Sequence, residues 1–74
     1  MPKPEPLVAG TVYEWLDYDW EPVMIQDVRD SGGRQEILGT IVRTGLPLIW
    51  IEVSPWEWRK FRLSRRIPQI KPKT

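Results

Sequence analysis

Two segments of this 74-residue chain carry side chains that could bind a partner, and the first combines acidic with aromatic residues. Four carboxylates alternate with four aromatic rings between positions 13 and 21, without an intervening cation. Exposed aromatic rings supply contact area at protein interfaces, and acidic neighbours select a basic partner. The alternative is that the tryptophans belong to the core and the acids only keep the surface hydrated. The residues predicted to bind a protein are Trp15, Asp17, Tyr18, Asp19, Trp20 and Glu21.

Within this acidic segment the two tryptophans have different predicted roles. A domain this small cannot easily bury all five of its tryptophans. We expect Trp15 to pack inward and Trp20, which lies between two acids, to stay partly exposed and to contribute to protein binding.

The second segment is basic, with seven cations and no acid in residues 59–74. Arginine and lysine neutralise phosphates, and an aromatic face can stack a base. The segment therefore predicts contact with nucleic acid or with an acidic groove on a protein, and the alternative is a solvated end of the chain. The predicted contact residues are Trp58, Arg59, Lys60, Arg62, Arg65, Arg66, Lys71 and Lys73.

Charge is distributed unevenly along the chain although the total is only +1. Residues 1–30 carry a net charge of −5, and residues 59–74 carry +7. Such asymmetry is typical of an interaction tail. Because exposed ion pairs contribute only about 0–1 kcal/mol each, we expect the two ends not to neutralise each other.

The residue types that the chain lacks exclude most enzyme chemistry. Without cysteine and histidine there is no thiolate nucleophile, no imidazole base and no sulfur-based zinc site. The sequence Asp30-Ser31-Gly32-Gly33 is too short for a phosphate-binding loop and predicts a turn. A glycosidase-like pair among the acids is disfavoured because a small barrel offers no deep cleft. We therefore expect a non-enzymatic, monomeric binding protein without a metal or cofactor.

Proline placement and hydrophobic pattern predict one small, mainly β domain. Prolines gather at both ends, so we expect flexible arms at residues 1–6 and 67–74 around a domain at residues 7–66. Strand-like runs separated by turn signals indicate a small antiparallel sheet or an SH3-like barrel. The run at 48–53 is the most apolar and is predicted to be central, with Ile49, Ile51 and Val53 facing the core.

Residues 54–63 carry two conflicting signals. Ser54, Pro55 and Glu57 form a capping-box pattern that predicts the start of a helix. The residues from Trp58 onward alternate as a strand does, with Phe61 and Leu63 on one side. We expect a short helical turn near 55–58 that leads into a strand.

The chain contains neither a stretch of about 18 apolar residues, as a membrane span needs, nor the apolar run of a signal peptide. We therefore expect a cytoplasmic protein.

The small size, the missing cysteine and histidine, the aromatic content and the basic end together resemble the small phage-encoded regulators that bind bacterial RNA polymerase. Members of that family displace the sigma factor or modify termination. The resemblance implies host takeover in the bacterial cytoplasm, by antitermination or sigma displacement, through contact with the beta flap or the N-terminal region of the beta-prime subunit. No binding residue is carried over by motif. The alternative is a small SH3-like barrel that binds DNA or RNA directly through its basic segment.

Overall fold

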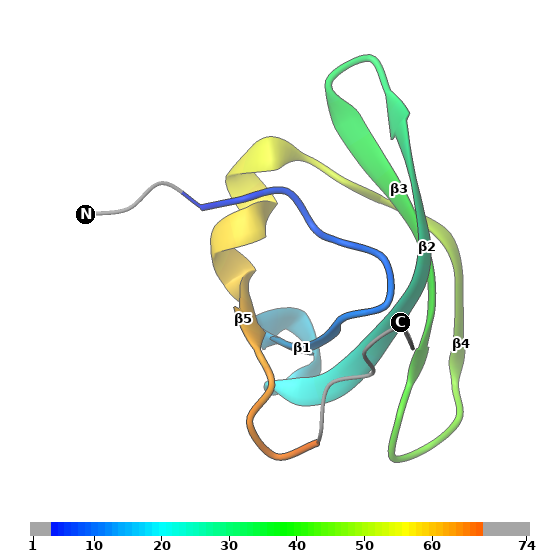
Figure 1. Ribbon diagram of the computed structural model, residues 1–74, viewed down its shortest axis with the longest axis vertical. Helices are drawn as coiled ribbons and strands as arrows, with labels where there is room; N and C mark the ends of the chain where they lie inside the picture. The colour runs from blue at the N-terminus through cyan, green and yellow to red at the C-terminus, as the bar shows by residue number, and fades with distance from the viewer. Residues whose placement is uncertain (1–3, 68–74) are drawn as a thin grey trace, which may run out of the picture.

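The computed structural model describes residues 4–67, which form one five-stranded antiparallel sheet of order β4-β3-β2-β1-β5 (Figure 1). The predicted mainly β fold is therefore confirmed. The expectations for residues 1–3 and 68–74, including Lys71 and Lys73, lie outside the described residues. No helix in residues 4–67 has the length and apolar character needed to cross a membrane. The strands are β1 (Val12–Trp15), β2 (Glu21–Ser31), β3 (Arg34–Ile41), β4 (Pro47–Val53) and β5 (Phe61–Leu63), and two 3-10 helices are η1 (Leu16–Tyr18) and η2 (Pro55–Lys60).

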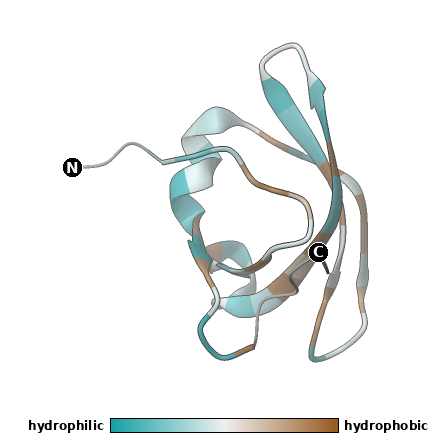
Figure 2. Cartoon of the chain, in the orientation of Figure 1, coloured by the Kyte–Doolittle hydropathy of each residue, from teal (hydrophilic) through white to brown (hydrophobic). Residues whose placement is uncertain are grey.

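The core lies on the inner face of the curled sheet. Because side chains alternate along a strand, every second residue of β3 is buried, including Ile37 and Ile41. Hydrophobic residues lie along the strands, whereas the outer end of the β2–β3 hairpin and η2 are mainly hydrophilic (Figure 2). The core residues are Leu7, Tyr13, Trp15, Val23, Ile25, Ile37, Ile41, Leu48, Val53 and Phe61.

The predicted turn between β2 and β3 consists of Gly32 and Gly33 alone, because β2 continues through Ser31. Both glycines have positive φ, 58° and 81°, as a two-residue hairpin of this type requires.

Two bulges bend the sheet at the same point of β3. In β2 the extra residue is Gln26, and in β4 it lies between Leu48 and Ile51. Both bulges lie opposite the β3 residues next to Gly39, and an extra residue bends a strand and increases its twist. A Cβ atom at Gly39 would lie 2.4 Å from the carbonyl oxygen of Met24. The close approach of β2 and β3 therefore requires glycine there.

The prediction for residues 48–53 is wrong in two respects. The strand is at the edge of the sheet, not at its centre. Its buried residues are Leu48 and Val53, Ile51 is partly buried against the core, and Ile49 is 64% exposed. The bulge in β4 explains this burial pattern. Because it adds one residue to the strand, Leu48 and Val53 lie on the same face although they are five positions apart. A strict period of two cannot reveal this arrangement.

Residues 54–63 form a helical turn followed by a strand, as expected, but the helical part is longer than predicted and the strand is shorter. The Glu57 carboxylate accepts a hydrogen bond from the Ser54 backbone N–H at 2.9 Å, which confirms the capping box. The 3-10 helix η2 continues to Lys60, so Trp58 is helical and not part of a strand. In β5 that follows, Phe61 is buried but Leu63 is exposed.

Candidate functional site

The aromatic residues of the acidic segment lie mostly in or against the core. Trp15 is buried, as predicted. It stacks on Phe61, with the two ring centroids 4.5 Å apart. Tyr18 packs edge-on against Trp15 at 4.9 Å and is half-buried. Trp20 is half-buried, which agrees with the expected partial exposure. Trp20 and Tyr18 are therefore the two partly accessible rings of this segment, and Tyr18 is the one packed against the core.

The acids of the same segment differ in whether they have an ionic partner. The Asp17 carboxylate lies 3.3 Å from the Lys60 ammonium, and Glu21 pairs with Arg43. Asp19 is exposed and forms no ion pair within residues 4–67.

Three of the predicted basic contact residues are paired with acids from the N-terminal half. Lys60 binds Asp17, and Arg62 and Arg66 both bind Glu14. The expectation that the two ends of the chain do not neutralise each other is therefore wrong for these cations. Its reasoning considered exposed pairs only, whereas the Glu14 side chain is only 7% exposed.

The other described members of the basic set have different environments. Arg59 and Arg65 are exposed, and neither forms an ion pair in the part of the chain that the structure describes. Trp58 is half-buried and packs against the core. Within residues 4–67, Arg59 and Arg65 are therefore the two cations of this set that form no ion pair with an acid.

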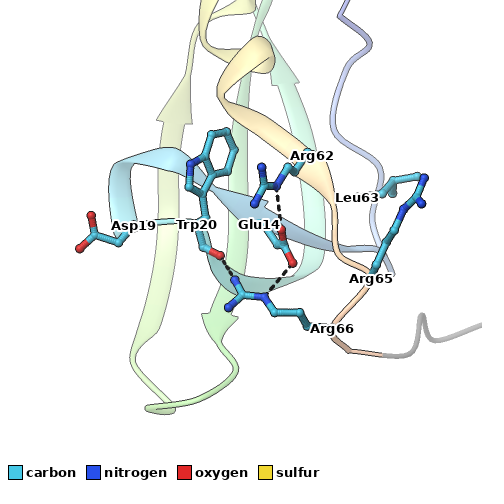
Figure 3. A pocket seen from close by; sticks show the side chains of 7 residues that line it. All are labelled: Glu14, Asp19, Trp20, Arg62, Leu63, Arg65 and Arg66. Carbon is cyan, nitrogen blue, oxygen red and sulfur yellow. Dashed lines mark hydrogen bonds and ion pairs between the residues drawn. The ribbon is translucent and has the colours of Figure 1, made fainter.

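Glu14 is the centre of a cluster that joins the two ends of the domain. Its carboxylate accepts hydrogen bonds from Arg62 Nε at 2.7 Å and from Arg66 Nε at 2.9 Å (Figure 3). The Ser64 hydroxyl donates a further hydrogen bond to it at 3.3 Å. Charge-assisted hydrogen bonds of this kind are the stronger ones in proteins. We call Glu14, Trp20, Arg62 and Arg66 the Glu14 cluster.

Strand pairing explains why these residues meet. In the β1–β5 ladder Glu14 lies opposite Arg62, on the face away from the aromatic core. The pairing continues one residue beyond β5, where the Ser64 backbone N–H donates to the Val12 carbonyl at 2.9 Å. Two residues further along the chain, Arg66 reaches the same Glu14 carboxylate.

The two guanidinium groups also set the ionisation of Glu14. The hydrogen bond from Arg62, followed by that from Arg66, lowers the pKa of the Glu14 carboxyl below its ordinary value, although burial opposes this effect. Glu14 therefore stays charged to lower pH than an ordinary glutamate.

The backbone of Trp20 is strained, and contacts from Arg62 and Arg66 stabilise it. Its φ is 60° and that of Asp19 is 54°, in the left-handed region that bulky residues rarely adopt. The Arg62 guanidinium carbon lies 4.1 Å from the centre of the Trp20 ring, and Arg66 donates a hydrogen bond to the Trp20 carbonyl. Strain of this kind persists only where surrounding contacts support it, and it gathers at functional sites.

An open hollow of about 750 Å³ lies over the Glu14 cluster. Figure 3 shows the arginine side chains gathered on one side of Trp20, while the Asp19 carboxylate points away from them. The buried carboxylate of Glu14 offsets only part of the arginine charge, so the hollow is cationic. It is lined by Glu14, Asp19, Trp20, Arg62, Leu63, Arg65 and Arg66.

A second hollow, of about 620 Å³, adjoins the first at Asp19 and has a different character. It lies between the η1 loop and the β3–β4 loop and is lined by Leu46, while Leu16 and Val42 are exposed apolar residues of the same two loops. Asp17, Asp19 and Glu21 also line it, together with Arg43. We call Leu16, Asp17, Asp19, Glu21, Val42 and Leu46 the acidic–apolar surface.

Sequence reasoning missed the exposed apolar residues that line the two hollows, the acid of the Glu14 cluster and one exposed ring on η2. Glu14 was absent from the predicted sites because an acid in an alternating strand is typical of a solvated face. The signal that could have found it was the possible pairing of β1 with the basic strand. Trp56 was also missed, although it is 60% exposed and has the Lys60 ammonium 4.9 Å from its ring centre.

Within residues 4–67 no three acidic side chains gather closely enough to hold a metal ion. No protein-family model, curated protein or solved structure matches the chain.

Proposed function

We propose that the protein is a non-enzymatic regulator that binds bacterial RNA polymerase and alters transcription initiation or termination. The observation that carries the binding role is the acidic–apolar surface, where apolar side chains of two neighbouring loops are exposed beside Asp17 and Asp19. Apolar area supplies affinity at an interface, while the surrounding acids select a partner with basic residues.

The internal pairing of the basic segment favours a protein partner over nucleic acid. Lys60, Arg62 and Arg66 already bind carboxylates, so a phosphate would have to compete for them. The exposed Leu16 and Leu46 add apolar contact area, which phosphate backbones do not match.

Polymerase is named as the partner because of the family resemblance. On that resemblance we propose a phage-encoded regulator that acts in the host bacterial cytoplasm, as a monomer. Its contact would be the beta flap or the N-terminal region of the beta-prime subunit, and its effect either sigma displacement or antitermination.

The test is binding to purified bacterial RNA polymerase, measured with the wild type, Trp20→Ala and Leu46→Ala. Truncating an anchor residue at an interface costs about 2 kcal/mol or more. We therefore expect Leu46→Ala, which removes an apolar side chain that lines the second hollow, and Trp20→Ala, next to Asp19 of the acidic–apolar surface, each to weaken binding at least about thirtyfold. Ile49→Ala is the matched control, since Ile49 is an exposed apolar residue on β4 away from both hollows. Equal binding by all four proteins, or no binding by the wild type, would refute the proposal.

Direct binding of DNA or RNA is the second candidate function, favoured by the exposed ring of Trp56. Lys60 lies over this ring, and Arg59 belongs to the same helix η2. Rings with adjacent cations bind single strands by stacking and by phosphate contact. A salt titration tests this function: Arg59→Ala, on the same helix as Trp56, should reduce the salt slope of single-strand binding by about 0.7 per lost phosphate contact.

A further inference from the structure

The Arg62 guanidinium is held in a fixed orientation that leaves part of it open. One face lies against Trp20, and its Nε atom binds Glu14 at 2.7 Å. The side chain is nevertheless 57% exposed. In Figure 3 Arg62 stands between Trp20 on one side and Leu63 with Arg65 on the other. The hollow therefore presents a planar, immobilised cation whose second face is accessible.

The hollow has the size and charge to take a small anionic ligand. Its volume of about 750 Å³ lies within the range of about 300–1,000 Å³ that small-molecule sites occupy. Arg65 lines it without an ion pair of its own in residues 4–67, and Arg66 lies beside it. Leu63, which is 61% exposed, adds an apolar wall.

We propose that this hollow is a subsite for one unpaired nucleotide of a single-stranded nucleic acid. The base stacks on the open face of the Arg62 guanidinium, and the phosphate contacts Arg65, which lines the hollow and forms no ion pair within residues 4–67. Unpaired bases stack on arginine planes as well as on aromatic rings, whereas bases inside a duplex present no free face. The inference rests on the second candidate function and narrows it to one nucleotide.

Glu14 is the positioning residue of this subsite. It binds both Arg62 and Arg66 and so fixes their relative geometry without contacting the ligand. A preset guanidinium loses less conformational entropy when a base binds than a free arginine side chain does.

The experiment compares oligodeoxyadenylate of about 12 nucleotides, a length that single-strand-binding domains cover, with an abasic strand of the same phosphate count. We expect the wild type to prefer the strand with bases at least about fivefold, the smallest effect typical of one stacked base. Arg62→Lys keeps the charge but lacks the plane, so it should lose this preference and keep its affinity for the abasic strand. The matched control is Arg29→Lys, which alters an arginine that also lies over a tryptophan and should leave both affinities unchanged.

A second variant makes the test independent of how well Arg62→Lys folds. Arg65→Ala removes no ion pair within residues 4–67 and should weaken binding of both strands by the same factor, with a smaller salt slope. A repeat with oligoriboadenylate shows whether RNA or DNA fits better, since only RNA carries the 2′-hydroxyl.

Three outcomes would overturn the subsite. Equal binding of both strands by the wild type would refute stacking at Arg62 and at Trp56 but leave phosphate contact, the remaining part of the second candidate function, standing. Binding of neither strand would refute both. If Arg62→Lys keeps the base preference but weakens polymerase binding, the hollow receives a side chain of the protein partner instead.

Discussion

The Glu14 cluster has a counterpart on the β2–β4 side of the sheet. There the Arg29 guanidinium carbon lies 3.9 Å from the centre of the Trp50 ring, and its Nε atom binds Glu36 at 2.8 Å. Trp50, like the tryptophan of the Glu14 cluster, has a positive φ, of 47°. The same arrangement of glutamate, arginine and strained tryptophan therefore occurs twice in one small sheet.

The two arrangements differ in burial and in sequence separation. The Glu36 side chain is 28% exposed and pairs with Arg29 directly across the β2–β3 hairpin. The Glu14 side chain is 7% exposed and binds residues about fifty positions away. A local surface pair adds little to stability, whereas a buried carboxylate with several donors couples distant segments. Only the second kind of contact can order a binding site.

The largest difference should appear when each carboxylate is neutralised. Glu14→Gln removes a charge that two arginines share and should lower Tm by roughly 5 °C or more. Glu36→Gln affects an exposed pair and should lower Tm by at most about 4 °C. Thermal unfolding followed by circular dichroism measures both. Equal losses in the two variants would show that burial does not distinguish the sites.

The second prediction concerns acid unfolding. The folded-state pKa of Glu14 is lowered, so its charged form adds stability that is present above the unfolded-state pKa, near 4.5. This contribution is lost as the pH falls below about 4.5 and through the folded-state pKa. Glu14→Gln should therefore have a flatter stability profile over that acidic range. Ile37→Val, which lowers stability without removing a charge, should keep the wild-type slope in urea titrations.

The third prediction uses glycine to compare backbone strain at the two tryptophans. Glycine is ordinarily less stable than alanine in a strand, but it accepts a positive φ without strain. The free energy of unfolding of Trp50→Gly should therefore be about 1 kcal/mol higher than that of Trp50→Ala. We expect a similar difference between Trp20→Gly and Trp20→Ala. Urea unfolding at both positions measures the differences. If the alanine variants are more stable than the glycine variants, the backbone at these positions relaxes from its positive φ when the tryptophan ring is removed.

The smallest effect is expected from Arg29→Lys. A cation over an exposed ring contributes about 0.5–1 kcal/mol, and lysine retains part of that interaction. The change in Tm should therefore stay within about 4 °C. Arg62→Lys should lower Tm more, because its partner Glu14 is buried. A larger loss for Arg29→Lys would reverse the ranking of the two sites.

Local signals in the sequence predicted much of the fold. The Gly32–Gly33 turn, the alternation of β3 and the capping box at Ser54 all depend on residues close together in the chain. The faces of β4 could not be predicted, because its bulge depends on how it pairs with β3 near Gly39. A bulge adds a residue without changing the local hydrophobic pattern.

The sequence predicted the two charged segments that supply the candidate site, but not the contact between them. Composition identified an acidic–aromatic end and a basic end, and it placed Trp15 inward and Trp20 at the surface. It did not show that Arg62 and Arg66 would share one buried acid, because that contact requires β1 to pair with β5.

The residue types alone establish which chemistry this protein has available: it contains no thiol or imidazole, it has five tryptophans, and its acidic and basic residues are concentrated toward opposite ends of the chain. Short-range preferences determined its turns and strand-forming runs. The tertiary structure decided which charges remain available to a partner. Strand pairing brings residues from both ends of the chain to Glu14, and burial there makes their mutual attraction stronger than exposed pairs would be. Pairing between distant strands depends on the whole sheet, so no local stretch of sequence contains it.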